Sequence, residues 1–170
     1  CNGTKISIRI YRQHNSVGVL PTLIYYHGGG FVIGTLKMYD YLCAKISSIC
    51  NIQVISIDYR LAPEYKFPVP VMDSLAAYNQ LVEDANKYNI DVKQLGIGGD
   101  SAGGNLAAVI SAESINTNRV PKFQFLIYPV VKNEPTPSFD LFKEGFLLEV
   151  DDMFWFANHY ISDLDNRTNP

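Results

Sequence analysis

Residues 95–107 read LGIGGDSAGGNLA and contain the pattern that decides the fold. The apolar run Leu95–Gly99 has the composition of a buried strand, and the Ala- and Leu-rich segment Ser101–Ile115 has that of a helix. Ser101 stands between them in a G-x-S-x-G pattern, whose glycines leave room for a sharp turn from strand to helix. We therefore predict a strand, a tight turn that carries Ser101, and a helix in direct succession.

The segments on either side continue this alternation. Four more runs are predicted to be strands: Lys5–Tyr11, Thr22–Tyr26, Gln53–Asp58 and Phe123–Tyr128. Helices are predicted at Tyr39–Cys50, from Pro68 and Pro70 onward, and at Val150–Ile161. One face of the second helix should carry Val71, Leu75, Tyr78 and Val82. The alternation indicates an α/β domain with a parallel sheet covered on both faces and with functional residues at the carboxyl ends of its strands.

The composition is that of one globular domain. Of 170 residues, 47% are hydrophobic and 18% are charged, which excludes a disordered chain and a coiled coil. The net charge is −3 and the basic residues are scattered, so neither nucleic acid nor an anionic membrane surface is a predicted partner. The longest nearly apolar stretch, Phe123–Val131, is about half the roughly 18 residues that a membrane-spanning helix needs, so no membrane span is predicted.

The cysteines and the chain ends bear on where the protein works. Cys43 and Cys50 lie too far apart along one predicted helix to form a disulfide. With Cys1 they are interpreted as core residues or free thiols of a reducing compartment, which favours a cytoplasmic location. Because the chain opens at Cys1 and ends in DNRTNP, after the proline-rich loop Asn133–Ser138 and an aromatic helix, we expect both ends to be cut from a larger domain.

The role of Ser101 has two interpretations. A serine hydroxyl becomes a nucleophile when it is exposed beside a base, and the amino end of a helix, near Ala102, favours developing negative charge. Alternatively, the pattern is only a tight turn in which the serine caps the helix.

A second motif, His27-Gly28-Gly29-Gly30, favours the catalytic interpretation. Three consecutive glycines allow backbone N–H groups to point into a cleft, where acyl transfer needs donors for the oxyanion. His27 is interpreted as a residue that fixes this loop through backbone hydrogen bonds rather than as a base. A glycine-rich phosphate cradle is the alternative, but neither G-x-G-x-x-G nor GK[ST] occurs, which disfavours nucleotide binding.

Three blocks together resemble the hormone-sensitive-lipase-like group of α/β-hydrolases, the carboxylesterases of the alpha/beta hydrolase-3 type: HGGGFVIG at 27–34, DYRLAPE at 58–64 and GDSAGGNLA at 99–107. The resemblance implies an α/β-hydrolase fold with a mostly parallel sheet and helices on both faces, incomplete at its C-terminal end. It also implies that Ser101 is the nucleophile and that the amides of Gly28, Gly29 and Ala102 form the oxyanion hole.

The same resemblance suggests supporting residues. Gly30 would shape the glycine loop, while Asp100, beside the nucleophile, is interpreted as structural. In DYRLAPE, the residues Asp58, Arg60 and Glu64 either organise the loop that faces the site or form a salt-bridged turn without a catalytic part, and we favour the second interpretation. Four residues after the glycine loop either line an acyl pocket or pack in the core: Phe31, Val32, Met38 and Tyr39.

The catalytic acid and base of this family are expected outside residues 1–170. They follow the serine in the order Asp or Glu, then His, on loops after later strands, whereas only one strand is predicted after Ser101. The sole later histidine, His159, lies in the aromatic helix and is interpreted as a surface or interface residue. Five acids follow Ser101 without the required strands: Asp140, Asp151, Asp152, Asp163 and Asp165. We expect residues 1–170 to be a partial catalytic domain that also lacks an amino-terminal cap.

The leading hypothesis is a serine carboxylesterase that cleaves short- to medium-chain carboxylic esters through an acyl-enzyme on Ser101. Its partner is a small-molecule ester, and the chemistry requires no metal and no organic cofactor. The alternatives are a non-catalytic small-molecule-binding protein on a hydrolase fold and an inert fragment of an esterase. Intact HGGG and GDSAGG motifs favour the enzyme. The resemblance further implies a homodimer formed through a last strand that lies beyond Pro170.

Overall fold

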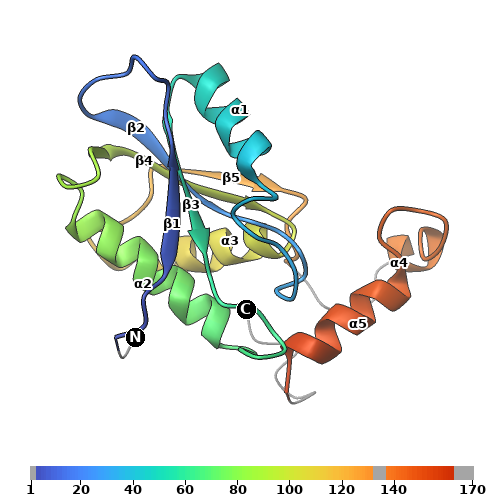
Figure 1. Ribbon diagram of the computed structural model, residues 1–170. Helices are drawn as coiled ribbons and strands as arrows, with labels where there is room; N and C mark the ends of the chain where they lie inside the picture. The colour runs from blue at the N-terminus through green and yellow to red at the C-terminus, as the bar shows by residue number, and fades with distance from the viewer. Residues whose placement is uncertain (1–2, 132–136, 163–170) are drawn as a thin grey trace.

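In the computed structural model of the protein, residues 3–131 and 137–162 are described (Figure 1). The strands are β1 (Ser7–Tyr11), β2 (Leu20–Tyr26), β3 (Gln53–Asp58), β4 (Ile90–Asp100) and β5 (Phe123–Ile127). The helices are α1 (Asp40–Cys50), α2 (Val69–Glu83), α3 (Ala102–Ser114), α4 (Pro137–Leu141) and α5 (Val150–Tyr160). The sheet order is β1-β3-β2-β4-β5, with β1 antiparallel to β3 and the other pairs parallel. The predicted mostly parallel sheet is confirmed.

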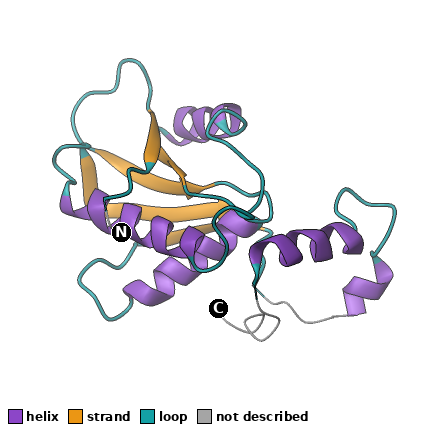
Figure 2. Cartoon of the chain, turned by 60° about the horizontal axis from the view of Figure 1, so that its bottom comes forward, coloured by secondary structure: helices purple, strands orange, loops and turns teal. Residues whose placement is uncertain are grey.

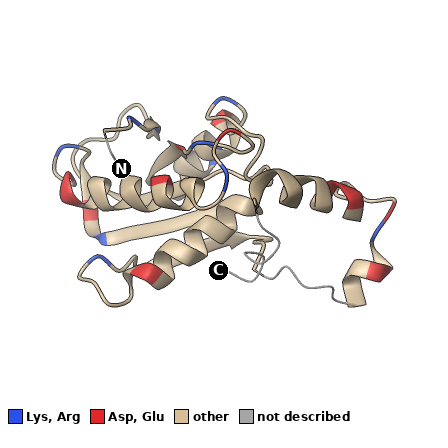
Figure 3. Cartoon of the chain, turned by 90° about the horizontal axis from the view of Figure 1, so that it is seen from below, with Lys and Arg blue, Asp and Glu red and all other residues tan. Residues whose placement is uncertain are grey.

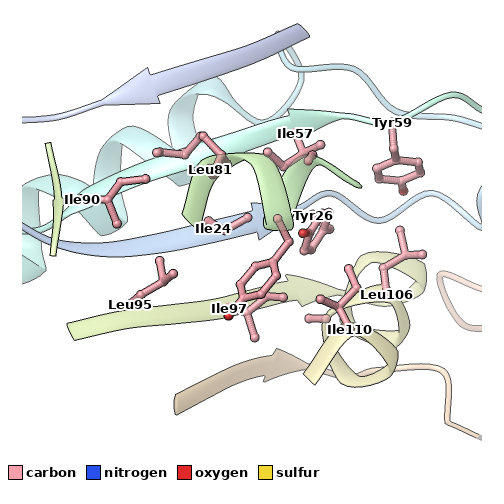
Figure 4. Close-up of a cluster of buried hydrophobic side chains, with 14 residues drawn as sticks. Ile24, Tyr26, Ile57, Tyr59, Leu81, Ile90, Leu95, Ile97, Leu106 and Ile110 are labelled. Carbon is pink, nitrogen blue, oxygen red and sulfur yellow. The ribbon is translucent and has the colours of Figure 1, made fainter. Parts of the chain in front are cut away.

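Helices cover both faces of this sheet, as Figure 2 shows with α1 on one side and α2 and α3 on the other. Neighbouring residues of β2 point to opposite faces, so Tyr25 packs in the α1 layer with Cys43, and Tyr26 packs in the larger core under α2 and α3. Figure 4 shows that larger core, in which Tyr26 is surrounded by aliphatic side chains of strands and helices, among them Ile57 and Leu106. Two-sided burial explains why β2 and β3 are apolar almost throughout.

The ends of the elements follow from local chemistry. Helix α1 begins at Asp40, whose negative charge suits the first turn, and ends where Asn51 adopts a left-handed conformation. Helix α2 accommodates Pro70 in its first turn, where the missing N–H is no loss. Strand β4 starts five residues before the predicted Leu95, because Ile90 pairs with β2 and is buried, although the residues between them are more exposed.

The structure extends one prediction about the helices and corrects another. The predicted apolar face of α2 packs against the core, where Tyr78 is buried and Val71, Leu75 and Val82 are partly buried. The buried side of this helix also contains residues that the sequence did not single out: Pro70, Asp73, Ser74, Ala77 and Leu81. The segment from Asn133 was expected to be a loop to Ser138, but a short helix, α4, begins at Pro137 because proline is tolerated at the first helical position. Residues 132–136 lie outside the described part, as do Cys1 and the DNRTNP ending.

Cys43 is buried and Cys50 is exposed, and both are free thiols, as predicted. Within residues 3–131 and 137–162, no helix combines the length and the apolar composition needed to cross a bilayer. In Figure 3 the Lys and Arg positions, in blue, are dispersed along the chain and do not form a continuous stripe. The two C-terminal helices, α4 and α5, extend away from the sheet (Figures 1 and 2).

Candidate active site

The two sequence motifs meet at one edge of the sheet. Tyr26 at the end of β2 pairs with Gly99 near the end of the parallel strand β4, so the glycine loop that follows β2 and the turn at Ser101 both leave the carboxyl edge. This is the edge at which open α/β sheets place their ligands. The two motifs thus lie at the edge where functional residues were predicted.

Ser101 occupies a strained backbone conformation between β4 and α3. Its φ is 51° and its ψ is −119°, a combination that costs free energy for a residue with a Cβ atom and that occurs most often at functional sites. Two backbone hydrogen bonds to the end of β5 and the residues after it hold Ser101 in this conformation. Its N–H donates to Ile127 O at 2.9 Å, and its carbonyl accepts from Val130 N at 3.3 Å. The side chain is partly exposed and makes no capping bond to α3, which excludes the helix-cap alternative.

The glycines of the motif permit this turn because they let the backbone of β4 and α3 lie against the backbone at the end of β2. A Cβ atom on Gly103 would lie 2.0 Å from the carbonyl oxygen of Tyr26, and one on Gly99 would lie 2.4 Å from the same oxygen. Real Cβ atoms do not come so close to backbone, so α3 can reach the glycine loop only if both positions lack a side chain. The predicted reason for these glycines is thus confirmed.

His27 is buried beneath the glycine loop and holds it. Its Nδ1 lies 2.8 Å from Gly28 O, and because a carbonyl only accepts, Nδ1 carries the proton. Tyr59 stacks on the imidazole at 4.5 Å between ring centroids and donates from its hydroxyl to His27 O at 2.6 Å. Burial lowers the pKa of His27, so the ring is neutral. These contacts agree with the interpretation of His27 as a loop-fixing residue.

Gly28 does not have the role that the resemblance implied. Its N–H donates to Asp100 Oδ1 and to the hydroxyl of Tyr39, each at 3.0 Å, so the expectation that it faces an oxyanion is contradicted. The amides of Gly29 and Gly30 donate to no described residue. Ala102 is the first residue of α3, where an N–H has no partner inside the helix. These three amides are free donors at the carboxyl edge of the sheet, where Ser101 also lies.

The DYRLAPE loop braces the glycine loop from the other side. Arg60 makes a two-pronged ion pair with Asp73 of α2, in which Nε and Nη2 each lie 2.7 Å from a carboxylate oxygen. Asp58 and Glu64 are exposed and are not its partners, so the expected salt bridge exists but its acid was misassigned. Sequence periodicity missed Asp73 because a buried carboxylate is invisible to a search for apolar faces. The DYRLAPE loop is joined to the end of the glycine loop by a backbone hydrogen bond from Ala62 N to Phe31 O, at 2.9 Å.

Helix α5 contacts the same loop through residues that the sequence did not single out. Tyr160 stacks on Phe31 at 4.0 Å between ring centroids, and its carbonyl accepts from Phe67 N at 2.9 Å. His159 instead turns to its own helix, with Nδ1 2.8 Å from Trp155 O, which agrees with its interpretation as a non-catalytic residue.

No described residue supplies a base to the Ser101 hydroxyl. Of the five acids that follow Ser101, Asp140 and Asp151 are exposed and Asp152 caps α5, while Asp163 and Asp165 lie outside the described residues. Within the described ranges, no three His, Cys, Asp or Glu side chains gather as they would around a metal ion. The arrangement offers a partly exposed serine in a strained turn at the start of α3, with free amides at Ala102 and in the glycine loop of the same sheet edge. Such groups suit attack on a carbonyl and stabilisation of an oxyanion.

Comparison with known proteins gives a consistent result. The sequence model of a family described as "alpha/beta hydrolase fold" matches residues 23–170. Ethyl acetate hydrolase of Pseudomonas putida is 34% identical over 99% of the chain and 55% of its own length. Carboxylic ester hydrolase LipN of Mycobacterium tuberculosis is 40% identical over 95% of the chain and 44% of its own length. The chain thus spans about half the length of the curated relatives it matches.

Solved structures agree with the fold. A serine-to-alanine variant of LAE6, an alpha/beta hydrolase enzyme from the metagenome of Lake Arreo, Spain, superposes with a TM-score of 0.94 at 40% identity, covering 98% of this chain and 54% of that one. EstE1, a thermophilic and thermostable carboxylesterase cloned from a metagenomic library, superposes with a TM-score of 0.93 at 39% identity, covering 99% of this chain and 58% of that one.

Proposed function

The chain belongs to the alpha/beta hydrolase fold family, and from this premise we propose that it carries the nucleophile and oxyanion hole of a carboxylic ester hydrolase. The observation that carries the proposal is the conformation of Ser101, whose positive φ holds a partly exposed hydroxyl at the junction of β4 and α3. Strain of this kind persists only where the surrounding structure enforces it. The backbone bonds from Ile127 and Val130 supply that enforcement.

In the proposed mechanism, Ser101 Oγ attacks the ester carbonyl carbon while a histidine outside residues 1–170 accepts the hydroxyl proton. The negative charge that develops on the carbonyl oxygen is bound by the amides of Gly29, Gly30 and Ala102. Collapse of this intermediate expels the alcohol, which receives the proton, and leaves an acyl group on the serine. Water then attacks that acyl group by the same route, releasing the carboxylic acid and restoring the hydroxyl.

Short- to medium-chain esters are the proposed substrates. The names of the relatives support this choice, because one hydrolyses ethyl acetate and others are called carboxylesterases. The proposed steps, in which Ser101 and then water accept the acyl group, require no metal or organic cofactor. We also propose a homodimer for the full-length protein, and a cytoplasmic location, for which the free thiols Cys43 and Cys50 are the support.

The proposal is tested by treating the full-length protein with a fluorophosphonate and recording its intact mass. We expect one adduct, because the reagent reacts with an activated serine, and we expect Ser101→Ala to abolish it together with the hydrolysis of p-nitrophenyl acetate and butyrate. Ser48→Ala, which removes an exposed hydroxyl of α1, is the matched control and should retain both the adduct and the hydrolysis.

Two results would reject the assignment. An adduct that survives Ser101→Ala would place the nucleophile elsewhere. A full-length protein that neither reacts with the fluorophosphonate nor hydrolyses either ester, while binding small molecules, would instead support a binding protein built on the hydrolase fold.

A further inference from the structure

We propose that Asp100 and Tyr39 form a buried clamp on Gly28 that sets the direction of the free amides in the glycine loop, so that both act as positioning residues for the oxyanion hole. The inference rests on the proposed ester hydrolysis. In that reaction neither Asp100 nor Tyr39 touches the substrate, and both would act only by positioning the glycine loop. One of them precedes the nucleophile directly. The other opens α1 as its N-cap residue, on the opposite face of the sheet from α3.

The clamp is a closed set of hydrogen bonds. Asp100 Oδ1 accepts from Gly28 N at 3.0 Å and from the hydroxyl of Tyr25 at 2.8 Å, while Oδ2 accepts from the hydroxyl of Tyr39 at 2.8 Å. The Tyr39 oxygen also accepts from Gly28 N at 3.0 Å. Gly28 N–H is thus shared between both members of the clamp, and its bond to Asp100 joins the glycine loop directly to the residue before Ser101.

The surroundings make these bonds costly to lose. Asp100 is 7% exposed, and none of the ion pairs among the described residues involves it. Its carboxylate therefore depends on neutral donors for stabilisation. Burial raises the pKa of Tyr25 and of Tyr39, which keeps both hydroxyls protonated as donors. A carboxylate with this set of donors has one favourable position, and the glycine loop is bonded to it.

The absence of a side chain at Gly28 is explained by the same clamp. A Cβ atom there would lie 2.3 Å from Asp100 Oδ2 and 2.9 Å from the carbonyl oxygen of that residue. Glycine thus lets the carboxylate sit against the loop backbone. This is a separate observation from the hydrogen bonds, and it shows that loop and carboxylate are fitted to each other.

The clamp acts on the amides that follow it. The clamp fixes the peptide plane that leads into the amides of Gly29 and Gly30. The next two planes are held by their own carbonyls, since Gly28 O is bonded to His27 Nδ1 and Gly29 O accepts from the amides of residues 32 and 33. The clamp thus sets the position from which these rigid planes present their N–H groups. Donors to an oxyanion must be aimed before the charge develops, and a small misplacement costs a large part of their effect. A carboxylate beside the nucleophile thereby controls the geometry of an oxyanion hole without contacting the substrate.

The test uses the full-length protein with two conservative variants, Asp100→Asn and Tyr39→Phe. We expect each to lower kcat for p-nitrophenyl acetate by about 10- to 100-fold while KM changes by less than about twofold, because the amides stabilise the transition state rather than the bound ester. Tyr26→Phe is the matched control. This variant removes the buried hydroxyl of the residue that follows Tyr25 in β2, and that hydroxyl is bonded to Ser74 O at 3.1 Å rather than to the clamp. It should leave kcat within about twofold of the wild-type value.

A second measurement reports on the clamp independently of catalysis. Residues 1–170 contain a single His-Gly pair, His27-Gly28, so labelling histidine carbonyls with ¹³C and glycine nitrogens with ¹⁵N isolates the Gly28 amide from the other glycines of this chain. We expect its proton resonance to move upfield in Asp100→Asn and in Tyr39→Phe, because a bond to a carboxylate or a phenol is lost or weakened. Tyr26→Phe should leave it in place.

The two readouts separate failure of the clamp from failure of the proposed function. An unmoved Gly28 resonance in both variants overturns the clamp. A resonance that moves while kcat stays at the wild-type value overturns the positioning role. If the wild-type protein is inactive and unreactive toward fluorophosphonate, ester hydrolysis is rejected, and the Gly28 resonance alone decides whether Asp100 and Tyr39 hold the loop.

Discussion

The buried imidazole of His27 combines two functions of a single side chain, since it fixes the glycine loop and fills the space beneath it. It donates from Nδ1 to the loop carbonyl of Gly28, while Nε2 has no partner among the described residues. A neutral ring tolerates this arrangement, whereas a protonated ring would bring an unpaired N–H and a positive charge into a buried place.

This environment predicts how stability depends on pH. Burial lowers the pKa of His27 in the folded protein, so below about pH 6.5 the unfolded state binds a proton that the folded state does not. The contribution to stability is complete above that pH and is lost as the pH falls toward the folded-state pKa. We expect the free energy of unfolding of the wild type to fall by at most about 1.4 kcal/mol per pH unit in this window.

Urea unfolding at several pH values between 7.5 and 5.5, in the wild type and in His27→Gln, measures this contribution. The variant is expected to be less stable at neutral pH, because the loop loses its support, and to show a flatter pH dependence below pH 6.5. An equal slope in both proteins would show that His27 is not the group responsible.

At the level of loops and helices, the ion pair between Arg60 and Asp73 fastens the DYRLAPE loop to α2. The Asp73 side chain is fully buried, while that of Arg60 is 30% exposed. A buried carboxylate with two charge-assisted bonds is a specific anchor, and removal of one partner leaves the other without compensation. The loop that it holds is joined to the end of the glycine loop by the hydrogen bond from Ala62 N to Phe31 O.

We expect Asp73→Ala to lower the free energy of unfolding by about 3 kcal/mol, the lower end of the range for a broken buried pair, because Arg60 regains some solvent. Asp84→Ala is the matched control at the end of the same helix. Its pair with Lys87 spans 4.0 Å between exposed side chains, so the loss should stay below about 1 kcal/mol. Urea unfolding decides the matter, and equal losses in the two variants would contradict the anchoring role of Asp73.

The same elements show what the sequence could and could not predict. Strands β2 and β3 were found because apolar runs buried on both faces leave a clear signal. On α2 the apolar residues that pack against the core were found, but Asp73 and Ser74, which are polar yet buried, were not. Asp73 faces inward because Arg60 bonds to its carboxylate, and such a tertiary partner leaves no mark on hydrophobic periodicity.

The candidate site likewise combines features that a local motif predicts with features that depend on tertiary contacts. The turn at Ser101 and its need for Gly99 and Gly103 are local properties, and a short motif predicts them. The occupation of the Gly28 amide depends on tertiary contacts, because one of its acceptors, Asp100, lies 72 residues away in the sequence. The resemblance therefore led to the glycine loop but not to the hydrogen bonds that occupy its first amide.

Across the whole molecule, apolar side chains are exposed along one side of the sheet and on the C-terminal helices. Strand β5 is an edge strand among the described residues, and its Phe123 and Phe125 are 47% and 42% exposed. The segment between α4 and α5 adds the fully exposed Leu147. An apolar edge strand with free backbone groups is a surface on which another chain can pair.

We expect residues 1–170, produced alone, to self-associate at about 100 µM, because this edge and the C-terminal helices remain uncovered. The double variant Phe123→Lys and Phe125→Lys should reduce the association, since lysines on an edge strand oppose pairing. Light scattering coupled to size exclusion measures the mass of both. A monomeric wild-type segment at this concentration would show that the exposed apolar surface does not mediate self-association.

The backbone bonds that hold Ser101 also determine when, during synthesis, the serine acquires its conformation. Its carbonyl is bonded to the amide of Val130, a residue added after it, and its amide is bonded to the end of the last strand of the described sheet. At about 5 to 20 residues per second, the ribosome needs roughly 1 to 6 seconds to add the intervening residues. During that interval a nascent chain contains the serine but not the hydrogen bonds that hold its strained turn. The conformation of Ser101 is thereby tied to the docking of β5, and so is any reactivity that depends on that conformation.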